Sequence, residues 1–313
     1  MALGLATFET DLDGALELGG RALTLAESSG RPLLVGAAFE ADALVLGALQ
    51  REDTLRQRSP ARFDVPIARR LTTGTEAQLR GPTLYHALAL PHVAALFPDA
   101  SSRTLLNRNL RALLRGYTAA GVPLRYFGTE VLVLLGHPVA LVGYDQSTSG
   151  AVLIEVLLGL ETASVVRPAL KREPPAALYG LLRGRPVPRD LLERAQRGVV
   201  ERLGVASHDV TSELPSVARV ERDRDLGHGA VAPIEIPLGV VEASIEPRAR
   251  VTGDLLVSTA AVREVELAAD AAFAPGASLT SSGILTALDG VPLDGARASD
   301  VLAAFERASQ GLY

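Results

Sequence analysis

The chain has 313 residues with 36 acidic and 31 basic side chains, which gives a formal net charge of −5. The sequence therefore lacks the excess of basic residues that is typical of a nucleic-acid-binding protein. Cysteine is absent, which excludes disulfides, thiolate metal ligands and a cysteine nucleophile. Hydrophobic residues make up 48% of the sequence, enough for a large core, but no apolar run reaches the roughly 18 residues of a membrane span. We therefore expect a cytoplasmic protein of one large and one small domain, without a membrane or nucleic-acid partner.

The first part of the chain predicts helices alternating with strands. Residues 11–28 are predicted to form a helix that its glycines interrupt. The apolar segments RPLLVGAA and DALVLGAL then predict two adjacent strands. The serine pair at 101–102 can cap a further helix, whose leucines recur every three or four residues and which ends at Gly121.

A hairpin with almost no polar face follows this helix directly. It covers residues 130–145, EVLVLLGHPVALVGYD, and turns at Gly136-His137-Pro138. The apolar segment 151–159 adds another strand. Residues 31–159 thus predict a strand-dominated sheet with helices packed against it.

The rest of the chain predicts an exposed connection and a separate C-terminal part. The Pro-rich, charged segment 167–180 predicts the connection, and a helix over 189–203 stops at Gly204. A charge run then indicates a boundary, after which the sequence predicts a strand in RVTGDLLVST and three helices, the last capped by Ser299. We expect a domain at 1–206, a linker at 207–239 and a small accessory domain at 240–313.

The segment RRLTTGT, residues 69–75, has the composition of an anion site. It follows a predicted strand end, and it combines paired guanidinium groups with hydroxyls and Gly74. Guanidinium forks bind phosphate or carboxylate oxygens, and glycine lets the backbone approach them closely. For such a segment alone, a solvated turn is the more common structure.

Four segments occur in an order that matches a known family. They are DALVLGALQ, IARRLTTGT, the stretch LLNRNLRALLRGYTAAGVPLRYFGTEVLVLLGHPVALVG and GAVLIEVLLGL. This order resembles the lipoate-protein ligase family, relatives of the biotin ligases, in which a Gly-Arg-x-Gln strand end, an Arg-Arg-x-[Ser/Thr]-Gly-Gly-Gly loop, an Asn-Asp strand and a Gly-x-Lys-Ile-Ser-Gly hairpin surround the acyl chain and the adenylate. The resemblance covers about residues 30–204, and the C-terminal part resembles the family's accessory domain.

The resemblance implies a fold and a set of ligand-binding residues. The fold is α+β, a mixed β-sheet flanked by helices with a small α+β C-terminal accessory domain. Gly47 and Gln50 match the first motif, although Ala48 replaces its arginine, and of the three loop glycines only Gly74 clearly survives. The implied ligand-binding residues are Gly47, Gln50, Arg69, Arg70, Thr72, Thr73, Gly74, Thr75, Glu130, Gly136, Gly143 and Asp145.

The family's catalytic lysine has no counterpart in the hairpin. Depending on which glycine of the motif is aligned, Pro138 or Ala140 takes its position. Neither supplies the cation that neutralises charge during acyl activation. Lys171, the one lysine of the chain, and His137 at the hairpin turn are weak substitutes, because they are more typical of a surface residue and a turn residue.

Three functions are open on this resemblance. The lost lysine, the diluted glycines and the missing cysteine favour a non-catalytic protein that binds a small acyl acid, an acyl-adenylate-type ligand or a partner protein. The alternative is an active acyltransferase or ligase that attaches lipoate, octanoate or a similar acid to a lysine of a carrier protein through an adenylate, with ATP and Mg as cofactors. A different reaction that uses His137, Glu130 or Asp145 as acid or base is the third.

Other titratable groups indicate structural roles. His86 and His92 lie in an apolar segment and are more typical of packed or hydrogen-bonded side chains than of ligands. The His-Asp pair at 208–209 has no third partner at a metal-like spacing, so no metal site is expected.

Two further groups of charges depend on geometry. Arg108, Arg111 and Arg115 share a helix face, and such a face is more often solvated than anion-binding. Asp145 and Glu155 lie on neighbouring predicted strands, and the sequence leaves open whether they meet.

Overall fold

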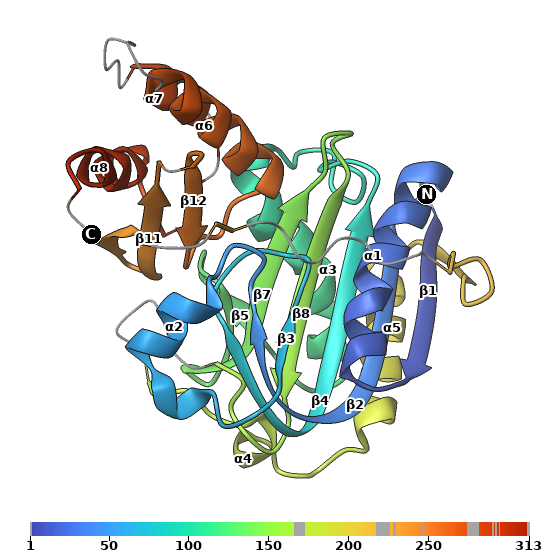
Figure 1. The fold of residues 1–313 in the computed structure, drawn as a ribbon. Helices are drawn as coiled ribbons and strands as arrows, with labels where there is room; N and C mark the ends of the chain where they lie inside the picture. The colour runs from blue at the N-terminus through green and yellow to red at the C-terminus, as the bar shows by residue number, and fades with distance from the viewer. Residues whose placement is uncertain are drawn as a thin grey trace.

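A large mixed sheet lies at the centre of the computed structural model, which describes residues 2–165, 173–216, 226–227, 230–245, 247–273, 282–289, 291, 293 and 295–311 (Figure 1). The strands of this sheet are β1 (Ala2–Glu9), β2 (Leu33–Leu46), β3 (Ile67–Arg69), β4 (Ala77–Leu90), β5 (Arg125–Tyr126), β6 (Val131–Leu134), β7 (His137–Gln146), β8 (Val152–Gly159) and β9 (Ala206–Asp209). Their spatial order is β5-β6-β7-β8-β4-β2-β1-β9, with β3 beside β2. β1 pairs in parallel with β2 and β9, and β3 with β2, whereas the other pairs are antiparallel.

Helices cover both faces of this sheet. The apolar side of α1 (Leu12–Ser29) packs on one face, against β2 and β4, and α3 (Leu105–Ala119) and α5 (Pro188–Leu203) pack on the other. Short elements complete this part of the fold: α2 (Glu52–Arg58), α4 (Leu178–Leu181) and the 3₁₀ turns Pro60–Arg62 and Ser102–Thr104. A mixed sheet flanked by helices confirms the predicted α+β fold class.

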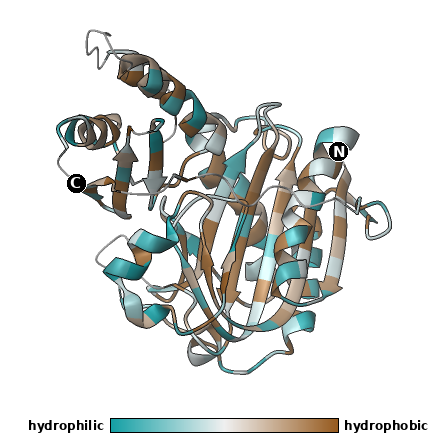
Figure 2. Ribbon diagram, viewed as in Figure 1, coloured by the Kyte–Doolittle hydropathy of each residue, from teal (hydrophilic) through white to brown (hydrophobic). Residues whose placement is uncertain are grey.

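A smaller C-terminal module, residues 232–311, adjoins the large sheet near α2 (Figure 1). It contains an antiparallel sheet of β10 (Ala232–Ile236), β11 (Gly239–Ser244) and β12 (Arg250–Gly253), with α6 (Thr259–Ala272), α7 (Ser282–Leu288) and α8 (Ala298–Ser309). Figure 2 shows hydrophobic residues concentrated in the central strands of the large sheet and a hydrophilic α2. The buried apolar residues of the C-terminal module contact those of the large sheet, so the two parts share one continuous core.

Several local predictions were wrong for identifiable reasons. One continuous strand, β2, replaces the two strands predicted in its place, because it pairs with β4 along its whole length without a turn. Glycines do not interrupt α1: Gly19 instead lets the helix approach β4, since a Cβ there would lie 2.5 Å from the Tyr85 hydroxyl. α8 begins at Ala298, so Ser299 lies inside the helix and is not its cap. β1 and β9 were not predicted.

The domain boundaries remain a prediction. β9 hydrogen-bonds to the large sheet and β10 to the small one, so the two sheets leave residues 210–231 between them. Most of the charge run in that interval lies outside the described residues, as does the segment 166–172 of the Pro-rich connection. Among the residues that are described, no helix has both the length and the apolar character needed to cross a membrane.

The crossing of α3 and α5 leads to a test of packing. A Cβ on Gly116 would lie 2.3 Å from the Ala195 carbonyl oxygen, which belongs to the facing backbone and cannot easily move. We expect Gly116→Ala to lower the free energy of unfolding by about 1–3 kcal/mol, measured by urea denaturation. Gly184→Ala is the control, because no atom lies within 4 Å of a Cβ there. Equal stability of the two variants would contradict this account of the crossing.

Candidate functional site

The candidate ligand loop, residues 69–76, connects β3 to β4 at the point where β2, β7 and the C-terminal module meet. Its residues from Thr72 to Glu76 are buried, as is Arg70, whereas Arg69 and Leu71 are half-buried. The structure therefore brings together the strand ends and the loop that the resemblance implied. It places most of this loop in the interior.

Both arginines of the loop donate to the protein's own backbone. Arg69 Nη1 donates to the carbonyl oxygens of Gly47, at 2.8 Å, and Gln50, at 2.7 Å. Arg70, which is only 1% exposed, donates to three carbonyl oxygens of the loop itself, those of Thr72, Thr73 and Thr75. The two guanidinium groups thus fix the loop and the turn beside it.

The backbone N–H groups of the loop also have acceptors within the protein. The N–H of Thr72 donates to Glu155 Oε2 at 3.0 Å, and that of Thr73 to the Tyr144 carbonyl at 3.1 Å. The N–H of Gly74 donates to the carbonyl oxygen of Leu255, in the C-terminal module, at 2.7 Å. An anion held by this loop would need these same donors.

Glu155 is the buried carboxylate beneath the loop. It accepts from the hydroxyls of Thr72, at 2.5 Å, and Tyr85, at 2.6 Å, in addition to the Thr72 N–H. Burial lowers the pKa of Arg70 to about 10, and the negative charges of Glu155, Glu76 and other neighbours act in the opposite direction. Arg70 is therefore a cation at neutral pH, compensated by carboxylates.

The glycines that match the family motifs bring backbone into close contact. A Cβ on Gly47 would lie 2.1 Å from the Gly74 carbonyl oxygen, and one on Gly143 would lie 2.3 Å from Thr72 Oγ1. Gly74 itself has φ of 108°, a conformation that L side chains rarely adopt. These glycines let the loop lie directly against the ends of β2 and β7.

The C-terminal module is hydrogen-bonded to the same loop. The Thr73 hydroxyl donates to the Val257 carbonyl at 2.7 Å and accepts from the Val257 N–H at 3.1 Å. Asp145 accepts from the N–H and the hydroxyl of Thr259, at 2.7 and 2.8 Å, at the start of α6. Asp145 is therefore bound to the module, whereas Glu155 is bound to the loop.

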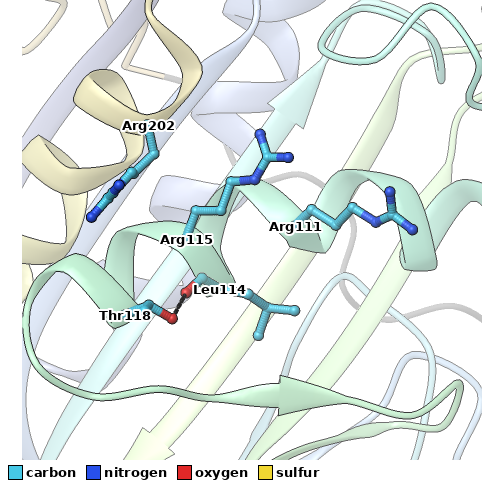
Figure 3. A pocket seen from close by; sticks show the side chains of 5 residues that line it. All are labelled: Arg111, Leu114, Arg115, Thr118 and Arg202. Atoms are coloured by element: carbon cyan, nitrogen blue, oxygen red, sulfur yellow. Dashed lines mark hydrogen bonds between the residues drawn. The ribbon is translucent and has the colours of Figure 1, made fainter.

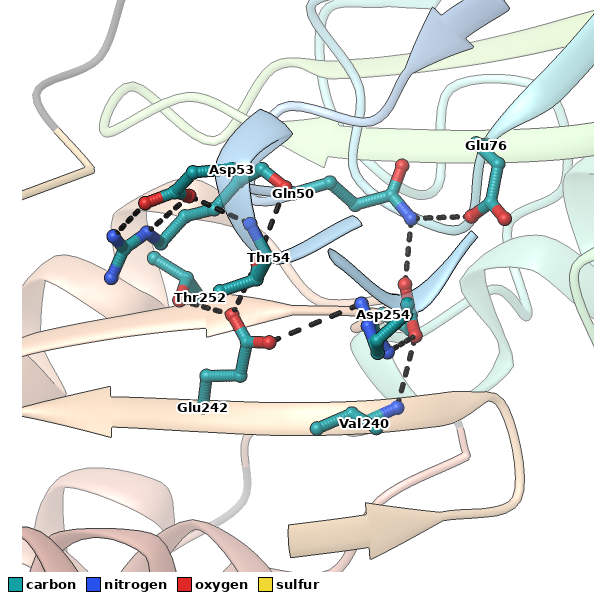
Figure 4. Close-up of polar contacts among 10 residues, drawn as sticks. Gln50, Asp53, Thr54, Glu76, Val240, Glu242, Thr252 and Asp254 are labelled. Carbon is teal, nitrogen blue, oxygen red and sulfur yellow. Dashed lines mark hydrogen bonds and ion pairs between the residues drawn. The ribbon is translucent and has the colours of Figure 1, made fainter. Parts of the chain in front are cut away.

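A buried polar network joins α2 to the module (Figure 4). The Gln50 amide donates to Glu76, at 2.7 Å, and to Asp254, at 2.6 Å, and its oxygen accepts from the Gly47 N–H. Arg58 forms an ion pair with Asp254 at 3.1 Å. Burial raises the pKa of Asp254 despite this cation.

Glu242 is the second carboxylate of this network. It accepts from the hydroxyls of Thr54, at 3.1 Å, and Thr252, at 3.3 Å. Burial likewise raises its pKa. The network contacts both parts of the chain, so it holds the C-terminal module beside the candidate loop.

The two hairpin positions that the motif resemblance assigns to the family's lysine, Pro138 and Ala140, are buried. Pro138 is buried and its carbonyl accepts from the Ala176 N–H, and Ala140 is fully buried between its pairing partners Leu132 and Leu158. His137 is the first residue of β7, and its Nδ1 lies 2.9 Å from the Pro174 carbonyl oxygen.

Three other candidates remain, of which the structure describes two. Glu130 is buried, and its charge contributes to the electrostatic environment of Arg70. Gly136 forms the hairpin turn with Leu135, both at positive φ. Lys171 lies outside the described residues.

His86 lies in β4 and His92 lies just after it, and the two side chains differ in burial. His86 is buried, with Nε2 at 2.6 Å from the Tyr117 hydroxyl of α3, as a packed side chain should be. His92 is exposed in the turn that follows β4, so of the two predicted alternatives, a packed or a hydrogen-bonded side chain, the packed one is wrong for this residue. Among the described residues, no group of three or more His, Asp or Glu side chains is arranged to hold a metal ion.

Comparisons with known proteins concern the fold. No protein-family model and no curated protein matches this sequence. LipL1 of P. falciparum in complex with lipoate is similar in structure, with 9% sequence identity, 99% of each chain covered and a TM-score of 0.61. A bi-partite lipoate protein ligase from Thermoplasma acidophilum has 13% identity over 67% of this chain and 86% of that chain, with a TM-score of 0.49.

A third similar structure is biotin protein ligase from Leishmania major in complex with biotinyl-5-AMP, with 8% identity over 80% of this chain and 98% of that chain and a TM-score of 0.36. The likeness to LipL1, which extends over both parts of the chain, carries the comparison. The chain therefore has a ligase-like fold, as the order of its motifs predicted.

Sequence reasoning did not assign two participants to this site. One is Glu155, which was considered only as a possible neighbour of Asp145; its signal was a single carboxylate inside the apolar run VLIEVLLG, since a charge buried in a strand requires partners. The other is the segment 253–259, whose contacts with the loop no local pattern announces.

The role of Glu155 can be tested by removing its charge. We expect Glu155→Gln to lower the free energy of unfolding by about 2 kcal/mol or more, because the variant removes the carboxylate that compensates the charge of the buried Arg70 most strongly and disturbs the bond to Thr72. Urea denaturation measures the change. Glu201→Gln, at an exposed position of α5, is the matched control and should stay within about 0.5 kcal/mol of the unsubstituted protein.

His86 predicts a pH dependence. Burial lowers its pKa from 6.5 to about 3. As the pH falls from 6.5 toward 3, the unfolded chain therefore binds a proton that the folded chain does not, and the free energy of unfolding falls by up to about 1.4 kcal/mol per pH unit.

The comparison isolates this one group. His86→Gln should remove that part of the slope, and His92→Gln, at an exposed position, should keep it. Denaturation at a series of pH values measures both, and identical slopes for the two variants would contradict the neutral, buried state of His86.

Proposed function

We propose that this chain is a divergent relative of the lipoate-protein ligases that no longer forms an adenylate and that binds an acyl acid, an acyl-adenylate-type ligand or a partner protein. The observation that carries the proposal is the state of the 69–76 loop. Its guanidinium groups and the N–H groups of Thr72, Thr73 and Gly74 are bonded to acceptors of the protein itself.

Because the donors of the loop already have acceptors within the protein, they are not directed at the phosphate groups of ATP with its Mg. The resemblance assigns the loop to the phosphate groups of the nucleotide, and those groups need guanidinium and N–H donors directed at them. Here Arg70 is fully enclosed and donates to carbonyl oxygens, and the Gly74 N–H is covered by Leu255. In this arrangement the described residues do not fit a triphosphate.

The hairpin supports the loss of the activation step. Either alignment of the motif gives a buried residue without a charge, Pro138 or Ala140, where a ligase needs a cation. Losing a positioned electrostatic group of this kind typically costs about 3–4 kcal/mol of transition-state stabilisation, or a factor of roughly 100–1,000 in rate. Binding requires no such group.

The ligand class follows from the fold and from the composition of the hairpin. A structure of similar fold holds lipoate, a small acid with an apolar chain. The hairpin strands β6 and β7 carry buried apolar side chains from Val131 to Leu134 and from Val139 to Val142. An acyl acid is therefore the small molecule that we propose, and a partner protein is the macromolecule.

A pyrophosphate-release assay tests the proposal. The full chain is incubated with ATP and Mg and with lipoate, octanoate or biotin in turn. We expect no pyrophosphate above the protein-free background, and we expect calorimetry without ATP to detect binding of at least one acid. If no acid binds, the partner protein remains as the ligand.

One result of this assay would contradict the proposal. Pyrophosphate release that depends on the acid and that Lys171→Ala abolishes, while the surface variant Arg183→Ala retains it, would overturn the proposal in favour of an active ligase. Arg183 is an exposed cation near the same connection and serves as the matched control.

A further inference from the structure

A groove lined by arginines lies between α3 and α5 (Figure 3). It encloses about 420 Å³ and is lined by Arg111, Leu114, Arg115, Thr118 and Arg202. Leu114 is half-buried, whereas the three arginines are exposed. The groove therefore has cationic walls and an apolar contribution from Leu114 and the arginine stems.

Among the described residues, the three arginines that line this groove have no carboxylate as an ion-pair partner. α3 contains three arginines and no acidic residue, although the whole protein has a net charge of −5. Arg108, on the same helix, pairs with Asp99 at 2.8 Å. Within the described part of the chain no carboxylate pairs with Arg111, Arg115 or Arg202, and Arg115 lies over the Phe97 ring at 5.9 Å.

The arginines stand on a rigid support. α3 and α5 are in backbone contact at their crossing, where added Cβ atoms on Gly116 and Gly198 would lie 2.3 and 2.8 Å from carbonyl oxygens of the facing helix. A close crossing of this kind leaves little freedom for one helix to move along the other. The spacing of the cationic positions is therefore fixed by the fold.

We propose that this groove binds an acidic segment of a partner protein. The inference rests on the part of the proposed function that assigns a partner protein as a ligand. The guanidinium groups of Arg111 and Arg115 follow one another along α3, and that of Arg202 comes from α5, so that they are spread along the groove (Figure 3). A compact anion needs converging donors, whereas carboxylates spaced by one helical turn match a spread of this kind.

The groove lacks the features of a nucleic-acid site. A single strand would require a longer cationic track and aromatic rings on which bases stack, and an acidic protein with three arginines in one groove offers neither. A segment whose carboxylates reach the arginines also brings its apolar side-chain atoms to Leu114. Charge complementarity of this kind favours association at low ionic strength.

Fluorescence anisotropy with the full chain tests the inference. The probe is a labelled helical peptide with glutamate at every fourth position on an alanine background, at low ionic strength. Substituting Arg111, Arg115 and Arg202 together by Glu should weaken binding about tenfold or more, because charge pairs turn into like-charge contacts. The same peptide with glutamine in place of glutamate should not bind.

A matched variant separates the groove from the overall charge. Arg183, Arg248 and Arg263 are exposed on other elements, and substituting all three by Glu changes the net charge by the same amount. This control should keep the affinity within about twofold. Equal losses for both triple variants, or no binding of the glutamate peptide by the unsubstituted protein, would overturn the inference.

Further measurements test whether another ligand, or a second copy of the chain, occupies the groove instead. A labelled oligonucleotide or inorganic tripolyphosphate that binds more tightly than the peptide through the same arginines would overturn it, as would a dimer that only the groove variant loses, measured by ultracentrifugation. The assay contains neither ATP nor an acyl acid, so a negative result here leaves the pyrophosphate test of the proposed function unaffected.

Discussion

The hydrogen bonding of the 69–76 loop is the constraint on which the rest of the site depends. In a fold that resembles ligases, this segment has the composition of an anion cradle, yet its donors are bonded to carbonyl and carboxylate oxygens of the same chain. A buried donor without an acceptor is costly, so a loop that binds no anion must find acceptors within the protein. Glu155 below the loop and Leu255 above it provide them.

The same constraint accounts for the presence of the motif-like residues in this chain, and it does so without assuming a bound ligand. Gly47, Gly74 and Gly143 bring backbones into contact, and Gln50 bridges Glu76 and Asp254. The residues that the motif resemblance assigns to ligand binding are thus residues with which this chain connects its two parts. Similarity of motif and similarity of role are separate matters, as is generally true of shared folds.

The sequence predicted the architecture well where periodicity and family order agreed. The helix at 12–29, the hairpin around Gly136 and the helix ending at Gly204 were all anticipated from apolar spacing and stop signals. The long strand β2 was not, because Glu40 and Asp42 in its middle resemble a turn although they lie on a strand paired along its whole length. Polar residues in a strand are ambiguous when only one sequence is available.

Within the site, composition identified the loop and the hairpin but not their environment. Two arginines, three threonines and a glycine are equally compatible with an open cradle and a closed one, because the difference lies in contacts with Glu155 and with residues 253–259, which are remote in sequence. Asp145 and Glu155 are a similar case, because the sequence leaves open whether they meet. In the structure Glu155 accepts from Thr72 and Asp145 accepts from Thr259, and only the three-dimensional arrangement identifies these partners.

The bonds of Thr73 and Gly74 to the C-terminal module have a consequence for how the molecule opens. The Gly74 N–H donates across the interface, and the N–H groups of Val257 and Thr259 donate back to Thr73 and Asp145, so separating the module from the large sheet would expose these three amides at the same moment. Gly74, Val257 and Thr259 therefore belong to one cooperative unit of local unfolding, and their amide protons should exchange with solvent together. Gly74 and the segment 253–259 are far apart in the sequence, but they open together.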